Sequence, residues 1–331
     1  MGARVTVIGA GPAGSCAAIA AALAGSRVEL YDQSRFPRHK VCGEFLSPGI
    51  VPELRRLGVW DRFVASQPAS IRRFVLHFGK KRMDAPLPEE AFGLSRYRLD
   101  ELLLERANEI GVPLIRSRLE TPAGPVVIAH GRTAPRTATG ERRLFGFKAH
   151  FEGPASDAIE LYFSGEIYAG VSAIEGGRTN VCGLAPERRL QGFGFDFDGI
   201  VRSIPALRER LAPLRRSMDW LATGPLVFRS VLRRPERRDV YAAGDALSFV
   251  DPFTGSGILG AVITGSMAGE YAARGIDSRE YLKMCRDRLT APFHAASLFR
   301  LVLRLGWADR IGLLAPPGLL FRLTRPALAP K

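Results

Sequence analysis

The sequence predicts an α/β fold, α+β overall, in which a Rossmann-like parallel sheet is interrupted by an inserted antiparallel β-sheet domain and followed by a helical C-terminus. Three observations support this prediction. The chain opens on a strand, a glycine-rich turn and a helix; strand-like runs cluster between residues 144 and 184; and a buried strand returns at residues 240–243. Because this last strand has the character of the first, we expect the parallel sheet to be discontinuous in the sequence.

The opening turn lies between a β-branched strand at residues 4–8 and an alanine-rich helix at residues 15–23. Its residues are Gly9, Ala10, Gly11, Pro12, Ala13 and Gly14. In this setting Gly9 allows a tight turn, Gly11 lets the backbone approach a phosphate, and Gly14 permits close packing of helix on strand. The helix N-terminus then faces the negative charge. We infer a dinucleotide site, with an ordinary βαβ unit as the alternative.

The second strand, residues 27–32, ends in a carboxylate eighteen positions after Gly14. The ribose hydroxyls of a dinucleotide need an acceptor at about this spacing, so Asp32 is the predicted ribose ligand. Glu29 is the rival acid, but it lies in the middle of the strand. The first 32 residues therefore predict a nucleotide-binding βαβ unit.

The elements that follow are read from the period of their apolar residues. A loop enters a helix within residues 43–59, a β-hairpin spans 71–83 around Gly79, and a helix with one apolar face spans 99–110. Further strands are expected at residues 144–151, 159–163, 167–174 and 178–184, and a polar helix at 204–214.

These elements divide the chain into three parts. The cofactor domain is expected to comprise residues 1–70, 92–140 and 235–275, and the β-rich substrate domain residues 71–91 and 141–234. Residues 276–331 form a C-terminal helical segment. The β-rich domain is thus an insertion into the cofactor domain.

Composition indicates a soluble protein of about two domains, since 331 residues suffice for a sizeable core. The four cysteines are scattered without a CxxC pair or zinc spacing, so we predict reduced thiols, a cytoplasmic protein and no metal site. The formal charge of +14 is spread along the chain without a recognisable nucleic-acid module. We therefore do not expect nucleic-acid binding. No apolar run is long enough to span a bilayer.

The segment from residue 291 to residue 325 reads as a basic amphipathic helix, in which apolar side chains alternate with Arg300, Arg304 and Arg310. Such a helix either packs on the body of the protein or lies on a membrane surface. Packing is the favoured interpretation, and peripheral membrane contact is the alternative.

Four motifs resemble those of the superfamily that includes the geranylgeranyl reductases and the flavoprotein monooxygenases, which share the para-hydroxybenzoate hydroxylase fold. The first is the glycine turn with Asp32, and the second is residues 37–44, PRHKVCGE, which match a PxxxxCGE signature typical of the geranylgeranyl reductase branch. The third is Arg96 with the helix that follows it. The fourth begins at Gly244, Asp245 and Ala246 and continues through Pro252 to Gly255 and Gly257.

The resemblance implies that the chain binds FAD. In this family the N-terminal motif binds the ADP half, and the residues matching Arg96 and Asp245 contact FAD, the aspartate in its ribityl and pyrophosphate region. The resemblance also places Cys42 and Gly43 close to the flavin face. Lys40 is a candidate for a phosphate or ribose contact, as are Arg38 and Arg35, and the sequence leaves the choice among these three open.

The end of the fourth motif can also be argued from the residues themselves. Gly255 and Gly257 lead into an apolar helical run at residues 258–268. The free N–H groups and the dipole of that helix N-terminus would stabilise negative charge on a reduced isoalloxazine. An αL turn with a capping acid at Asp245 is the alternative.

Three residues are candidates for catalysis. Cys42 would have a lowered pKa if Lys40 acts on its thiol, and a packing role is the equal alternative. Tyr168 begins a segment, residues 168–183, that partly matches the substrate-domain pattern of the reductases. His130 stands where relatives carry an aspartate, and it is either a proton donor or a structural residue.

The expected function is that of an FAD-dependent oxidoreductase with NAD(P)H as the electron donor. Its substrate would be a hydrophobic small molecule, lipid-, isoprenoid- or polyketide-like, and the reaction either alkene reduction or oxygen-dependent hydroxylation. The region 111–136 is shorter than in the family, which bears on NAD(P)H use more than on FAD binding. The alternative is a catalytically degenerate flavin-binding protein that acts as a partner or regulatory subunit.

Overall fold

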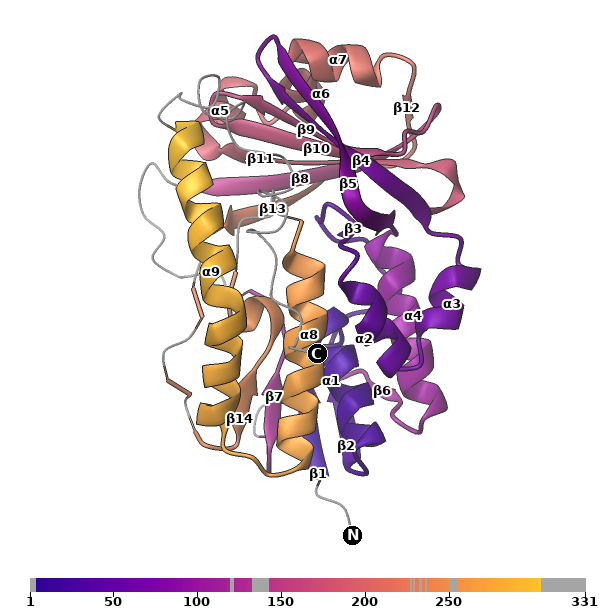
Figure 1. Ribbon diagram of the computed structural model, residues 1–331, viewed down its shortest axis with the longest axis vertical. Helices are drawn as coiled ribbons and strands as arrows, with labels where there is room; N and C mark the ends of the chain where they lie inside the picture. Colours follow the sequence, from indigo (N-terminus) through magenta and orange to yellow (C-terminus); the bar gives the residue numbers. More distant parts are fainter. Residues whose placement is uncertain are drawn as a thin grey trace.

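Two β-sheets, one above the other in Figure 1, organise the computed structural model of this chain. The structure describes residues 4–119, 122–132, 143–226, 228, 230–231, 234–235, 237–249 and 255–304. Within these residues the α/β architecture predicted from the sequence is confirmed.

The lower sheet has five strands, which are parallel in every pairing, in the order β14-β7-β1-β2-β6. They are β1 (Arg4–Ile8), β2 (Arg27–Tyr31), β6 (Leu114–Ile115), β7 (Val126–Ile128) and β14 (Val240–Ala242). The late strand β14 pairs with β7, so the predicted return of the chain to this sheet is confirmed.

Three helices cover this sheet: α1 (Pro12–Leu23), α4 (Arg96–Glu109) and α8 (Gly257–Ala273). Helices α1 and α8 pack very closely, as Figure 1 shows. A Cβ atom on either Gly265 or Gly269 would lie 2.1 Å from a carbonyl oxygen of α1. The absence of a side chain at these two positions is therefore what lets the helix after the fourth motif lie against the helix after the first.

The upper sheet has nine strands, in the order β12-β8-β11-β10-β9-β4-β5-β3, with β13 also paired to β8. They are β3 (Phe45–Leu46), β4 (Ala69–Phe78), β5 (Lys81–Gly93), β8 (Leu144–Glu152), β9 (Ala158–Ser164), β10 (Ile167–Ala173), β11 (Thr179–Pro186), β12 (Arg215–Arg216) and β13 (Leu221–Leu226). The hairpin around Gly79 and the four strands expected between residues 144 and 184 are confirmed.

The expectation of a purely antiparallel upper sheet is wrong in one pairing. Strands β4 and β9 run parallel, with Phe74 opposite Ile159, so the sheet is mixed. The hairpin β4–β5 comes from an earlier part of the chain than the meander β8 to β11. It covers the edge of that meander at β9, and apolar side chains of both strands pack together there.

The two faces of the upper sheet differ in character because side chains alternate along each strand. In β8, Phe147, Ala149 and Phe151 belong to an apolar cluster shared with the helices above the sheet. These helices are α5 (Glu187–Gly192), α6 (Phe197–Arg202) and α7 (Pro205–Leu211) (Figure 1). Lys148 and His150 alternate with those residues and therefore lie on the opposite face, toward the cofactor domain.

The remaining helices are α2 (Ile50–Arg56), α3 (Trp60–Ala65) and α9 (Ser278–Arg304), with short 3₁₀ turns at Glu175–Gly177 and Gly244–Ala246. The amphipathic segment expected at residues 291–325 begins inside α9, and its part beyond residue 304 lies outside the described residues. Among the described residues, no helix is long and apolar enough to cross a membrane.

Candidate functional site

The glycine turn joins β1 to α1 with backbone geometry that only small residues allow. Gly9 has φ of +101°, and a Cβ atom there would lie 2.4 Å from the Ala129 carbonyl oxygen. A Cβ atom on Gly14 would lie 1.7 Å from the carbonyl oxygen of Gly9. Gly11 is the N-cap of α1 and Pro12 its first residue, so the backbone N–H groups of this helix end are free of side-chain caps. The turn therefore has the form that the sequence predicts for a pyrophosphate site.

Asp32 lies at the end of β2 beside this turn. Its carboxylate accepts hydrogen bonds from the N–H groups of Ala10, at 2.9 Å, and Ser34, at 2.8 Å. Although burial raises the pKa of Asp32, these N–H donors outweigh it and hold the pKa below its ordinary value. The rival acid Glu29 is engaged elsewhere, in an ion pair with Arg4. Asp32 is thus the ionised acceptor next to the turn.

Four cations face the space in front of the turn. Arg96 is held by a two-pronged ion pair with Asp100, at 2.8 Å for each hydrogen bond, and its Nη2 would lie 3.6 Å from a Cβ atom on Gly11. The others are Arg38, Lys40 and Arg132. Burial, and then the nearby Arg38, Arg96 and Arg132, lower the pKa of Lys40. These neighbouring positive charges favour negative charge beside the turn.

The residues present fit the pyrophosphate of FAD. The Nε of Arg38 is buried and has no hydrogen-bond partner among the described residues, although its guanidinium lies 3.9 Å from Asp32. Such an orphaned donor beside an open helix N-terminus matches a phosphate oxygen as partner. Arg38, Lys40 and Arg96 would hold the pyrophosphate, and Asp32 a ribose.

The fourth motif lies at the carboxyl end of β14, next to the N-terminus of α1. Gly244 has φ of +59°, and its N–H donates to Thr264 Oγ1 of α8 at 2.9 Å. The next residue, Asp245, keeps 40% of its side chain exposed and lies 3.9 Å from the Nε of Arg132. Desolvation raises the pKa of Asp245, and Arg132, Arg96 and Lys40 oppose this effect. Its carboxylate is therefore open to a ligand on the cationic side of the site.

The last part of this motif leads into α8. Gly255 has φ of +64°, and Gly257 is the first residue of the helix, with no atom of the described residues near the position of its Cβ. The predicted helix at residues 258–268 is confirmed. Pro252, another predicted cofactor ligand, lies outside the described residues.

The Cys42–Gly43 segment is held by the upper sheet. Asn180 Nδ2 donates to the carbonyl oxygens of Cys42, at 3.1 Å, and Gly43, at 2.9 Å. Ser172 Oγ donates to the same Gly43 oxygen at 3.4 Å. Gly43 itself is exposed, with no atom near the position of a Cβ. Strands β10 and β11 thus fix this segment where the two sheets meet.

The expectation that Lys40 lowers the pKa of Cys42 is wrong. Burial raises the pKa of this thiol and outweighs the opposing effect of Arg96. The sulfur also accepts a hydrogen bond from the N–H of Glu44 at 3.4 Å. Cys42 is therefore a protonated, largely packed thiol rather than a reactive thiolate.

Glu44 forms a buried charged cluster that the sequence interpretation missed. Its carboxylate accepts a hydrogen bond from His150 Nε2 at 2.7 Å, forms an ion pair with Lys148, and accepts from the N–H of Arg96 at 2.6 Å. Glu44 and Lys148 are fully buried. The third residue of the CGE motif thereby connects Arg96, at the start of α4, to the upper sheet.

A signal for this cluster was present in the sequence. Lys148 and His150 are two residues apart in an otherwise apolar strand, which places both on one face of the sheet. They pair directly opposite Cys182 and Asn180 of β11. His39 completes the neighbourhood, with its ring centroid 5.2 Å from that of His150.

The other two predicted catalytic residues lie apart from this cluster. Tyr168 is on β10, where its ring is 6.0 Å from that of Phe163. His130 follows β7, is exposed, and its Nδ1 lies 3.0 Å from the Gly131 carbonyl oxygen. Arg132, two residues further on, was not predicted although it belongs to the same segment. It lies closer to the site, with its guanidinium against Asp245 and over the Phe249 ring.

Comparison with known proteins agrees with this geometry. Residues 2–122 match the family of FAD-binding domains. A menaquinone reductase of Mycolicibacterium smegmatis is 56% identical over 57 residues, which cover 17% of this chain and only 14% of that relative. Digeranylgeranylglycerophospholipid reductase 1 of Methanopyrus kandleri is 28% identical over 338 residues, covering 87% of this chain and 86% of the relative.

Solved structures share the fold. The crystal structure of a flavoprotein/dehydrogenase from Cytophaga hutchinsonii superposes with a TM-score of 0.79 at 17% identity, over 97% of this chain and 91% of that one. At this identity the likeness concerns the fold alone. It extends over both sheets, so the arrangement of the cofactor domain and the upper sheet is common to the two proteins.

Proposed function

We propose that this chain reduces a hydrophobic, isoprenoid-like small molecule with electrons from NAD(P)H. It belongs to the superfamily of FAD-dependent oxidoreductases that includes the geranylgeranyl reductases and the flavoprotein monooxygenases. The observation that carries the proposal is the junction of the two sheets. There Asn180 and Ser172 of the upper sheet hold the Cys42–Gly43 segment, next to the cations of the cofactor domain. The same junction would face a substrate on one side and a flavin on the other.

The residues of the cofactor domain have distinct tasks in this proposal. Asp32 binds a ribose, and Arg38, Lys40 and Arg96 neutralise the pyrophosphate. Asp245 binds the ribityl chain. When bound, FAD supplies hydride acceptance and transfer, which no side chain can perform.

Two features then concern the ring end of the cofactor. The N-terminus of α8, which begins at Gly257, offers N–H groups and a positive dipole end to negative charge. Gly43, which is exposed and has no neighbour at its Cβ position, leaves room for a flat ring or a substrate beside it. Lys148 and Glu44 lie beneath and are excluded from water, so they keep the segment in place rather than touch substrate.

A relative that aligns with most of this chain favours reduction over hydroxylation. The Methanopyrus protein, aligned over 87% of the chain, is named as a reductase of a digeranylgeranyl lipid. The named menaquinone reductase matches a shorter segment and also has an isoprenoid-bearing substrate in its name.

The test is a flavin reduction experiment on the purified protein. We expect a flavin absorbance spectrum, anaerobic bleaching by NADPH or NADH, and slow reoxidation that a geranylgeranyl lipid or menaquinone accelerates. Rapid reoxidation by oxygen together with a hydroxylated product would establish a monooxygenase instead. A flavin that neither nucleotide reduces and no acceptor reoxidises would favour the partner or regulatory role. A colourless protein that cannot be reconstituted with FAD would overturn the proposal.

A further inference from the structure

An arginine-rich pocket lies away from the candidate cofactor site, at the opposite end of β14. Among the residues that the structure describes, five arginines line it: Arg234, Arg237, Arg238, Arg279 and Arg286. Its volume is about 470 Å³, within the usual range for small-ligand sites. Strand β14 begins at Val240 beside this pocket and leads to Asp245 at its other end, so the pocket is distinct from the FAD region. We infer that it binds a phosphate-bearing anion, either free or at the head of a lipid.

The arginines come from two segments that are fixed to each other. Ser278, the fully buried first residue of α9, donates its N–H to the Arg238 carbonyl and its hydroxyl to the Arg237 carbonyl, both at 2.9 Å. One turn later, the hydroxyl of Tyr281 donates to the Ala242 carbonyl of β14 at 2.7 Å. The part of the pocket formed by Arg237, Arg238 and the start of α9 is therefore held in place without a ligand, which lowers the entropy cost of binding.

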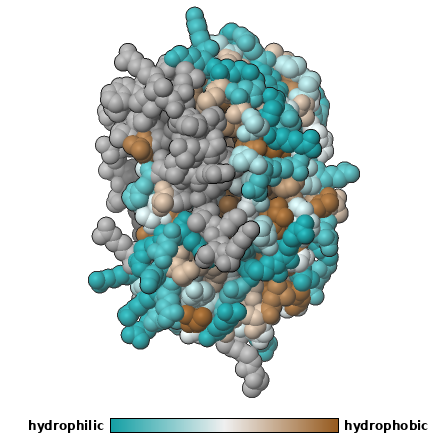
Figure 2. Space-filling view, viewed as in Figure 1, coloured by the Kyte–Doolittle hydropathy of each residue, from teal (hydrophilic) through white to brown (hydrophobic). Residues whose placement is uncertain are grey.

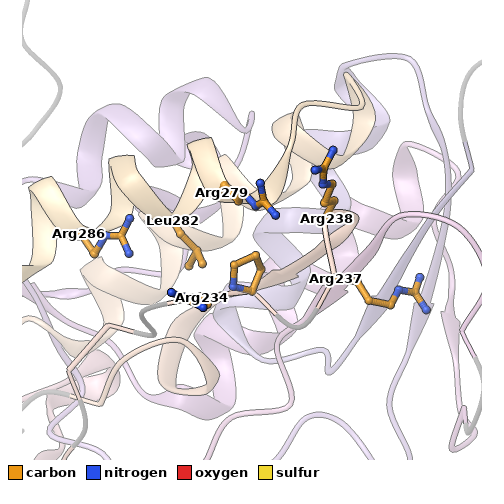
Figure 3. Close-up of a pocket in the computed structure, with 7 residues that line it drawn as sticks. Arg234, Arg237, Arg238, Arg279, Leu282 and Arg286 are labelled. Atoms are coloured by element: carbon orange, nitrogen blue, oxygen red, sulfur yellow. The ribbon is translucent and has the colours of Figure 1, made fainter.

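Three of the lining side chains lie on one side of α9. Arg279, Leu282 and Arg286 are three and four residues apart, which places them on a single helix face, as Figure 3 shows. Figure 2 shows hydrophilic residues gathered at the lower left of the molecule, over the start of this helix. Leu282, which is buried, also lines the pocket and gives it an apolar side chain among the arginines.

The charges in the pocket are only partly balanced. Arg237 pairs with Asp239 at 2.7 Å and points away from α9 in Figure 3, and Arg238 lies 3.7 Å from Asp277. Among the described residues, Arg234 and Arg279 have no carboxylate within ion-pair distance, and no carboxylate lines the pocket. Guanidinium groups gathered in a concave site repel each other until an anion enters.

Phosphate is the anion that this arrangement recognises best. The planar guanidinium fork binds phosphate oxygens through two parallel hydrogen bonds, which a point charge such as lysine cannot do. A diphosphate or a phospholipid headgroup offers several such oxygens within the volume of the pocket.

The test uses FAD-saturated protein, so that the cofactor's own phosphate site is filled. The pocket variant is Arg234→Gln with Arg279→Gln. The control is Arg189→Gln with Arg274→Gln, which removes the same charge from two exposed positions outside the pocket. Binding of inorganic diphosphate is measured by calorimetry at fixed ionic strength, and binding to phosphatidylglycerol and phosphatidylcholine vesicles by cosedimentation.

We expect the wild type to bind diphosphate, phosphatidylglycerol vesicles or both, the pocket variant to bind at least about tenfold more weakly, and the control to change by less than about twofold. Diphosphate binding without vesicle binding identifies a free ligand. Vesicle binding that diphosphate displaces identifies a lipid headgroup. The inference is overturned if the wild type binds neither probe, or if the pocket and control variants lose equal affinity.

Discussion

Replacing Glu44 with glutamine removes a negative charge that two buried bases share. In the wild type, Glu44 accepts from His150 Nε2 at 2.7 Å, from the N–H of Arg96 at 2.6 Å, and from the ammonium of Lys148. Lys148 and Glu44 are both fully buried. After the substitution, Lys148 keeps only neutral acceptors among the described residues, namely the new amide oxygen at position 44 and the Lys40 carbonyl oxygen at 3.2 Å.

The magnitude follows from that burial. Removing one partner of a buried ion pair costs about 3–5 kcal/mol, because the other charge is left in a low-dielectric interior. The control is Glu152→Gln in β8, the strand that carries Lys148 and His150, since Glu152 pairs with Arg215 where both side chains are more than half exposed. That change should cost about 0–1 kcal/mol. A domain typically has only about 5–15 kcal/mol of stability, so the first loss is a large fraction and the second is not.

The stability difference between the wild type and Glu44→Gln should also depend on pH. Although burial raises the pKa of Glu44, His150 and Lys148 outweigh it and hold the pKa below its ordinary value. A depressed carboxylate pKa stabilises the fold above the unfolded-state pKa of about 4.3, and this contribution is lost as the pH falls through the folded-state pKa. The difference between wild type and Glu44→Gln should therefore be complete at pH 7 and shrink below about pH 4.

The assay is urea unfolding at pH 7, followed by circular dichroism with the same excess of FAD for every variant. A third variant, Glu44→Gln with Lys148→Met, removes the stranded charge and should be more stable than Glu44→Gln alone. The buried ion pair does not contribute as expected if Glu44→Gln costs no more than Glu152→Gln, or if Glu44→Gln with Lys148→Met is no more stable than Glu44→Gln alone.

Three further predictions concern the cofactor domain. Gly269→Ala should destabilise the protein by about 1–3 kcal/mol, because its Cβ would lie 2.1 Å from an α1 carbonyl oxygen. Gly260→Ala in the same helix is the control: no described atom lies near its Cβ position, so it should stabilise the protein by about 0.5–1 kcal/mol. Equal effects of the two changes in thermal unfolding would argue against the close contact of α8 with α1. Asp32→Asn should weaken FAD binding about tenfold in a fluorescence titration, since a charged acceptor becomes neutral, and an unchanged affinity would remove Asp32 from the site. Cys42 should react with iodoacetamide at pH 8 more slowly than a free thiol, because burial raises its pKa; labelling as fast as that of a model thiol would contradict its packed state.

Periodicity and turn chemistry were sufficient to predict most of the fold. The strand β1, the glycine turn and α1 are local features, and each is encoded by neighbouring residues. The same holds for the hairpin around Gly79. The parallel pairing of β4 with β9 was not predictable in this way, because it joins segments about eighty residues apart and is decided by which edge of the meander is open.

In the candidate site too, local features were predicted from the sequence and long-range contacts were not. Asp32 and Gly244 were found because their spacing within a motif is local, and the structure places both at the turn. Glu44 was included only as part of the PxxxxCGE motif and its contacts were not predicted, since its partners Lys148 and His150 lie about a hundred residues away. Alternating polar residues in the apolar strand β8 were the available signal for that cluster.

FAD binding by the purified chain tests the central claim most directly. Titration with FAD, followed by flavin fluorescence, should show saturable binding of one FAD per chain. Asp245→Ala removes a carboxylate that is 40% exposed, so it should lower the affinity while leaving the fold intact. The account is contradicted if the folded wild-type protein binds no FAD, or if Asp245→Ala binds it as tightly as the wild type.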